Sequence, residues 1–99
     1  MGDYLLLMYD DVTDHALVND SKKWDTYMSM LRQSEHFSGG SSIKVRWSAK
    51  RSSTAKPPSG ITGYIRVKAV NTVAAKLFLQ GNPVYEAGGT VEICELTRD

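Results

Sequence analysis

Four side chains that could exchange protons follow the first apolar stretch of the chain. They are Asp10, Asp11, Asp14 and His15. A carboxylate close to an imidazole can move a proton to or from a substrate, and strand ends are common places for such groups. No fixed spacing links these residues, so they also fit a solvated acidic loop. The second histidine, His36, lies far away in the sequence.

A metal site and a nucleophilic cysteine have weaker support. Asp10, Asp14 and His15 could supply ligands, but the sequence contains no HxxxH or CxxC spacing. Cys94 is the single cysteine and cannot form an internal disulfide. A cysteine in the middle of a strand is usually a small buried residue. We therefore expect no metal ion and no cofactor.

Basic residues and a tyrosine could form a surface for nucleic acid. The set comprises Lys44, Arg46, Lys50, Arg51, Lys56, Arg66 and Lys68, with Tyr64 as a stacking platform. The net charge of only +1 supplies no global attraction for phosphate, and GYIRVKAV lacks the aromatic-rich consensus of RNA-binding ferredoxin-like domains. Ion pairs with Glu92 and Glu95, or with their copies in a partner chain, account for the same charges. Nucleic-acid binding is therefore the weaker alternative.

The residues favour a small-molecule pocket on the open face of a sheet. Arg46 and Arg66 would present guanidinium groups, and Tyr64 a phenol, towards one space walled by apolar side chains of the first strand. Such a lining favours a small anionic or phenolic compound. Tyr9 and Asp10, at the end of the first strand, complete this set of candidates. The same arginines could instead bridge a dimer.

The first half of the chain predicts a strand, a helix and a second strand. The continuous apolar run 4–9 indicates a central strand covered on both faces. A helix should begin at a capping residue among positions 19–21, and its apolar face comprises Trp24, Tyr27, Met28 and Leu31. We expect Phe37 and the Gly39-Gly40 pair to close it. Residues 43–47 then alternate apolar and basic side chains, as in a half-buried strand.

The second half repeats this order after a loop over residues 48–60, which is basic and rich in serine and proline. A loop of that length in a compact domain is usually mobile or functional. An alternating strand is expected over 61–70, followed by a short helix capped by Asn71. The apolar face of that helix includes Ala74, Leu77 and Phe78, and Gly81 and Pro83 end it. A loop over 82–89 leads to a last strand over 90–96.

This order predicts a ferredoxin-like α+β fold, a βαββαβ antiparallel sheet with two helices on one face. The alternation places Ile43, Val45, Ile65, Val67, Val91 and Ile93 under the helices. It places Lys44, Arg46, Tyr64, Arg66, Lys68, Glu92 and Cys94 on the open face. An open face with an apolar centre needs a cover, and the sheet of a second copy is the simplest one. We therefore expect one domain over residues 1–99 and a homodimer.

Length and composition agree with a small soluble protein. A chain of 99 residues can bury one core without disulfides. The apolar stretch 5–8 is far shorter than a membrane span and follows Asp3 rather than a basic segment, so we expect neither a signal peptide nor an anchor. A single cysteine suits a reducing cytoplasm.

Four segments together resemble the YCII-related (DGPF-domain) family. They are YLLLMYDD, FSGGSSI, GYIRVKA and GNPVYEAGGTVEI, and the similarity covers nearly the whole chain, most strongly residues 61–96. The resemblance implies a dimeric α+β barrel, in which two ferredoxin-like sheets face each other around a small pocket. It also adds Asn82, Glu86 and Glu92 to the pocket candidates, because these residues lie in the last segment.

The sequence departs from this family at two points. The DGPF segment is missing, and residues 51–60 stand in its place. Some members pair a histidine on the first helix with an aspartate before the proline that follows the second. Here Lys23 or Trp24 stands at the first position, and Asn82 precedes Pro83. The resemblance therefore assigns no reaction. A lyase or isomerase of a small organic acid and a purely structural or nucleic-acid-binding dimer remain as alternatives.

Overall fold

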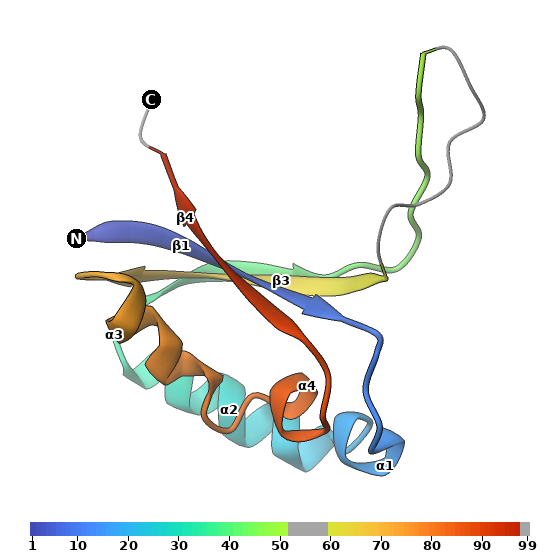
Figure 1. Ribbon diagram of the computed structural model, residues 1–99. Helices are drawn as coiled ribbons and strands as arrows, with labels where there is room; N and C mark the ends of the chain where they lie inside the picture. The colour runs from blue at the N-terminus through green and yellow to red at the C-terminus, as the bar shows by residue number, and fades with distance from the viewer. Residues whose placement is uncertain (52–59, 98–99) are drawn as a thin grey trace.

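The computed structural model describes residues 1–51 and 60–97 (Figure 1). In chain order its elements are β1 (Gly2–Tyr9), α1 (His15–Val18), α2 (Ser21–Gln33), β2 (Phe37–Ser42), β3 (Ile61–Ala69), α3 (Thr72–Lys76), the 3-10 helix η1 (Leu77–Leu79), α4 (Pro83–Glu86) and β4 (Val91–Leu96). None of the helices in these two stretches is both long and apolar enough to cross a membrane.

The four strands form an antiparallel sheet in the order β2-β3-β1-β4. The most apolar strand, β1, lies between β3 and β4, and all the helices lie on one side of the sheet (Figure 1). Each half of the chain crosses over one strand before it re-enters the sheet. This is the ferredoxin-like α+β fold predicted from the order of elements.

Alternating side chains separate the two faces of the sheet. Along β1, Tyr4, Leu6 and Met8 are buried under the helices. The predicted alternation of β3 is confirmed, because Ile65 and Val67 are buried with them and the intervening side chains are more exposed. We call the uncovered side the open face; it carries Leu5, Leu7, Tyr9, Tyr64, Arg66, Lys68, Glu92 and Cys94.

Helix α2 packs against the core with the side chains of its inner face. It begins where predicted, since the Asp20 side chain accepts a hydrogen bond from the backbone N–H of Lys22 at 2.9 Å. Tyr27 and Leu31 are buried in the core. The Tyr27 hydroxyl donates to the backbone carbonyl oxygen of Phe78 in η1 at 2.6 Å, and burial raises the pKa of this phenol. The hydroxyl therefore stays a donor and ties α2 to the second half of the chain.

The prediction that a strand occupies residues 43–47 was wrong. The strand is Phe37–Ser42, and residues 43–50 have no regular secondary structure. Helix α2 ends earlier than predicted, because Ser34 caps it and Glu35 adopts the left-handed conformation (φ 64°) that the glycine pair was expected to supply.

The two glycines instead allow β2 to approach β3 closely. Gly39 has a φ of +110° at a bulge in β2, and Gly40 lies opposite Ile65, where a Cβ atom would collide with the Tyr64 carbonyl oxygen. Val45, predicted to lie under the helices, is 81% exposed, and Trp47, the last residue of the predicted strand, is 87% exposed, both on a segment that leaves the sheet (Figure 1). Most of the predicted loop, residues 52–59 with Lys56, lies outside the described residues.

The helical region after β3 is divided into three short pieces. Asn71 caps α3 as predicted, accepting from the backbone N–H of Ala74 at 2.9 Å. Leu77, predicted on the apolar face, is 71% exposed. Helix α4 lies within the predicted loop 82–89, and Asn82 begins it by accepting from the backbone N–H groups of Val84 and Tyr85 at 3.0 and 3.1 Å. Asn82 is fully buried.

The two asparagine caps supply a matched stability test. Replacing Asn82 by Ala leaves two backbone N–H groups near the core without an acceptor, and we expect a loss of about 2 kcal/mol or more in unfolding free energy. Asn71→Ala removes an exposed cap and should cost about 1 kcal/mol or less. Urea unfolding of both variants measures the difference. Equal losses would contradict the role of Asn82 as a buried helix cap.

Candidate ligand-binding site

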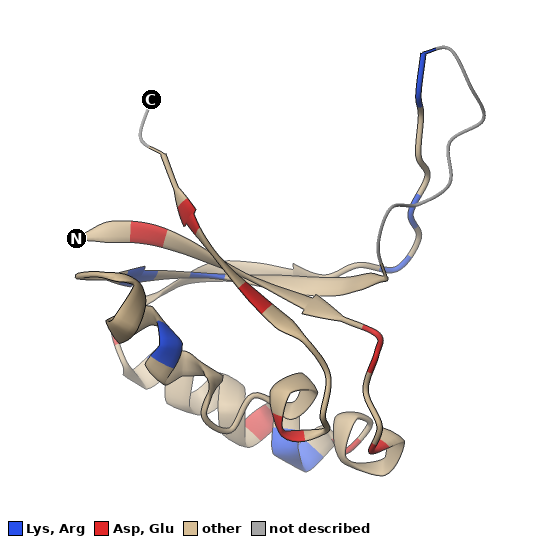
Figure 2. Cartoon of the chain, in the orientation of Figure 1, with Lys and Arg blue, Asp and Glu red and all other residues tan. Residues whose placement is uncertain are grey.

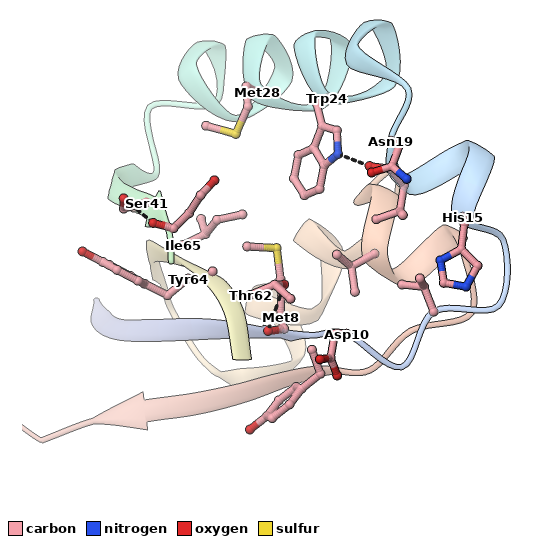
Figure 3. A pocket seen from close by; sticks show the side chains of 17 residues that line it. Met8, Asp10, His15, Asn19, Trp24, Met28, Ser41, Thr62, Tyr64 and Ile65 are labelled. Atoms are coloured by element: carbon pink, nitrogen blue, oxygen red, sulfur yellow. Dashed lines mark hydrogen bonds between the residues drawn. The ribbon is translucent and has the colours of Figure 1, made fainter. Parts of the chain in front are cut away.

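A cavity of about 680 Å³ opens between the sheet and α2. Its apolar floor includes Met8 and Ile65, which face the helices from β1 and β3. Trp24 and Met28 extend from α2 over this floor (Figure 3). On the inner face of α2, Tyr27 is therefore packed in the core, whereas Trp24 and Met28 line the cavity.

The cavity has room because a glycine stands at a helix-facing position of β3. Gly63 is buried, and a Cβ atom there would lie 3.1 Å from Cε of Met8 and 3.0 Å from the Ser41 carbonyl oxygen. Any side chain at residue 63 would therefore crowd Met8 and the backbone of Ser41, two residues that line the cavity. The absence of a side chain at Gly63 therefore leaves space for the cavity at this end of the sheet.

The Trp24 ring is fixed in place by the protein itself. Its Nε1–H donates to the Val18 carbonyl oxygen at 2.6 Å, and the ring packs edge-on against Tyr27 with centroids 6.5 Å apart. Figure 3 shows the ring reaching from α2 towards the sheet, with its N–H turned to the chain near Asn19. The indole therefore offers the cavity an apolar surface and no free donor.

Polar groups form the rim of the cavity. Ser41, Ser42 and Thr62 supply hydroxyls from β2 and β3, and His15 and Asn19 come from α1 and the residue after it. The Ser41 hydroxyl donates to the Ser42 carbonyl oxygen at 2.9 Å, and the Thr62 hydroxyl donates to the Met8 carbonyl oxygen at 3.3 Å (Figure 3). These two hydroxyl oxygens keep their lone pairs as acceptors.

The four proton-exchanging candidates separate into two pairs. Asp10 and His15 line the cavity. Asp11 instead accepts from the backbone N–H and the hydroxyl of Thr90 at 2.7 and 2.6 Å, and these bonds lower the pKa of its carboxyl group. Asp14 accepts from the backbone N–H of Leu17 at 3.0 Å and begins α1. Asp11 and Asp14 therefore hold the chain in place.

The predicted pocket residues do not gather at one place in the chain's own fold. Tyr9, Asp10 and Tyr64 line the cavity, although both tyrosines belong to open-face positions. Arg66 lies on the open face, and Arg46 is exposed beyond β2. A pocket between two facing sheets needs a second copy of the chain, so the open-face pocket stays a prediction.

The three candidates from the last segment have local partners. Glu92 accepts from the Tyr9 hydroxyl at 2.8 Å on the open face, and this bond raises the pKa of Tyr9. Glu86 is exposed and accepts from the backbone N–H of Gly81 at 3.1 Å. Asn82 begins α4, and its amide also points to the sulfur of Met8 at 3.6 Å. Glu86 and Asn82 therefore accept hydrogen bonds from the backbone in and just before α4.

No sequence pattern distinguished the side chains of the cavity walls from those of the core. Trp24 and Met28 recur at helical spacing, which a packed core produces equally well. The usable signal was Gly63, a glycine at an apolar position of an alternating strand.

Two other chemistries have no assembled site in the described part of the chain. No three His, Cys, Asp or Glu side chains of residues 1–51 and 60–97 come together to hold a metal ion. Cys94 lies half-buried on the open face, and burial raises the pKa of its thiol, which disfavours the nucleophilic thiolate.

No protein-family model matches the chain, and no curated protein sequence matches it. Among solved structures, the chain is similar to 5-chloro-2-hydroxyhydroquinone dehydrochlorinase (TftG) from Burkholderia phenoliruptrix AC1100, in a complex with 2,5-dihydroxybenzoquinone. The TM-score is 0.62 at 10% sequence identity, and the match covers 98% of this chain and 95% of that one. A likeness at this identity shows a shared fold.

The Asp11–Thr90 contact predicts a specific acid sensitivity. Because the pKa of Asp11 lies below its ordinary value of 3.8, the ionised group stabilises the fold above that pH, and this contribution is lost as the pH falls through the lowered pKa. We expect Asp11→Asn to lose less unfolding free energy than the wild type between neutral pH and about pH 3. Denaturant unfolding at both pH values, with Asp25→Asn on α2 as control, measures this. Parallel losses in all three proteins would contradict it.

Proposed function

We propose that this protein binds a small, flat, hydroxylated ring compound in the cavity under α2. The observation that carries the proposal is the cavity itself, with apolar surfaces above and below and polar groups confined to its rim. Its volume of about 680 Å³ lies within the range of small-molecule sites. A planar ring between Trp24 and the Met8–Ile65 floor would bury its faces and turn its substituents to the rim.

The structural neighbour supports this class of ligand. It is described with 2,5-dihydroxybenzoquinone, a single six-membered ring with hydroxyl and carbonyl groups at its edge. From the sequence segments that resemble the YCII-related family, we also propose that the chain is a distant relative of that family. The single cysteine supports a place in the cytoplasm.

We propose binding without an assigned reaction. Where some YCII-like members carry an aspartate, Asn82 is buried and its side-chain oxygen is used by two backbone N–H groups. The acid–base pair of those members has no counterpart at Asn82. A lyase or isomerase would need another proton-transfer pair.

The two tryptophans allow a direct binding test. Trp24 lines the cavity, whereas Trp47 is 87% exposed outside it. We expect the indole N–H resonance of Trp24 to shift when tyrosol (4-hydroxyphenylethanol) is added, and that of Trp47 to stay in place. Trp47→Phe assigns the two signals. Titration with 2,5-dihydroxybenzoquinone tests the neighbour's compound in the same way.

Filling the cavity should abolish this binding. Met28→Trp places a larger side chain under α2, and we expect tyrosol affinity to fall at least about tenfold, or about 1.4 kcal/mol. Met30→Trp is the matched control, because Met30 lies on the same helix outside the cavity and is 38% exposed. Tyrosol binding that survives Met28→Trp unchanged would place the ligand elsewhere.

We also propose that the whole chain forms one subunit of a homodimer whose open faces meet. Leu5 and Leu7 lie at the centre of that face and are only partly covered. Leu5 stands beside Arg66 and Cys94 in the neighbouring strands. The sheet of a second copy, placed over these residues, would bury the apolar side chains and could form ion pairs with the charged ones.

Light scattering tests the dimer. We expect a mass twice that of the 11.0 kDa chain. Leu5→Glu should shift the protein towards monomer, because the new carboxylate can pair with Arg66 in one chain but is costly to bury between two. Val73→Glu, on an exposed position of α3, should leave the mass unchanged. A wild-type monomer at all concentrations would refute the facing-sheet arrangement.

A further inference from the structure

We infer that the cavity selects ring compounds that carry an ammonium group and discriminates against those that carry a carboxylate. This inference rests on the proposed function, since it concerns the ligand of the same cavity. It follows from the charges and the hydrogen-bonding groups of the described lining residues.

The formal charges of the lining favour a cation. Asp10 is the one carboxylate among the described lining residues, and none of those residues is Lys or Arg. Figure 2 shows Lys and Arg on the segment after β2, along β3 and on the helices. Arg66 and Lys68 on β3 face away from the cavity, on the open face. A carboxylate inside the cavity would therefore find no guanidinium or ammonium partner in this part of the chain.

The hydrogen-bonding groups of the lining point the same way. The N–H of Trp24 and the hydroxyls of Ser41 and Thr62 each donate to a backbone carbonyl oxygen. What Ser41 and Thr62 still offer is lone pairs, which accept hydrogen bonds. An ammonium group brings three donors and no acceptor, whereas a carboxylate brings acceptors only. The oxygens of Ser41 and Thr62 therefore complement an ammonium group.

The Trp24 ring adds an attraction for positive charge. Its N–H is held by Val18, so the ring meets the cavity without a donor. Cations are attracted to the faces of aromatic rings, most strongly to indole. Asp10 is exposed at the rim, so its own attraction is screened by water. Trp24 and Asp10 together therefore favour a ligand with a positive charge near its ring.

The neutral donors of the rim fit the other end of such a ligand. Asn19 has an amide N–H₂ group and His15 an imidazole, and both line the cavity beside α1. These groups can donate to the hydroxyl oxygen of a phenol. The ligand class is therefore a small hydroxylated aromatic amine.

Three compounds of nearly equal shape separate charge from size. Tyramine carries an ammonium group, tyrosol a neutral hydroxyl, and 4-hydroxyphenylacetate a carboxylate. Affinities are measured from the Trp24 indole resonance at about pH 8, above the ordinary titration range of imidazole. We expect tyramine to bind at least about fivefold tighter than 4-hydroxyphenylacetate, with tyrosol between them.

Two variants test the source of the preference. Asp10→Asn should reduce the ratio of the tyramine to the 4-hydroxyphenylacetate affinity and leave tyrosol binding within about twofold. Asp25→Asn removes the same charge from an exposed position of α2 outside the cavity and should leave that ratio unchanged.

The outcomes separate this inference from the proposed function. If tyrosol binds and the carboxylate binds as tightly as the amine, the charge selection is overturned and the ring-binding site stands. If none of the three compounds shifts the Trp24 resonance, both are overturned. A preference that falls equally in Asp10→Asn and Asp25→Asn would show only a general effect of net charge and would refute selection by the cavity.

Discussion

The hydrogen bond from the Tyr27 hydroxyl to the Phe78 carbonyl oxygen holds α2 against the second half of the chain. The Tyr27 phenol depends on this bond, because it is buried and loses contact with water on folding. Leu31, one turn further on, is fully buried and packs the same helix onto the sheet. Because α2 is fixed at Tyr27, the Trp24 side chain, one turn earlier, extends over the part of the sheet that lies below it.

The sheet carries a glycine among the residues that line the cavity below that turn. Gly63 leaves the floor open, and Trp24 cannot drop into the space because its N–H is held by Val18. An unfilled apolar volume forfeits dispersion contacts and costs stability. A larger aliphatic side chain at residue 63 could have filled this volume only by displacing Met8 and the backbone of Ser41. The cavity therefore follows from the packing around it, and its apolar walls and polar rim are what a ring-shaped ligand requires.

A continuous apolar run predicted β1, and side-chain alternation predicted β3 and β4, whose apolar positions meet helices of the same chain. Alternation failed as a predictor for residues 43–47, whose pattern is equally regular but whose apolar side chains Val45 and Trp47 are exposed. An alternating pattern indicates that one face of a strand is suited to burial, but it does not identify the element that covers this face. The glycine pair before them was interpreted as a helix end because Glu35 gives no sign of a left-handed turn. Of the site, Asp10 could be predicted from its place after a strand. Trp24 and Met28 could not, because core and cavity walls share the helical period.

The methyl groups of the four methionines test the central claim, a ligand site under α2, most directly. Met8 and Met28 line the cavity, whereas Met1 and Met30 lie outside it. With methyl-labelled methionine, saturating tyramine should shift the signals of Met8 and Met28 and produce ligand contacts to both, while the other two signals stay in place. Contacts to Met30 without contacts to Met8, or no shift at any methionine, would contradict the site.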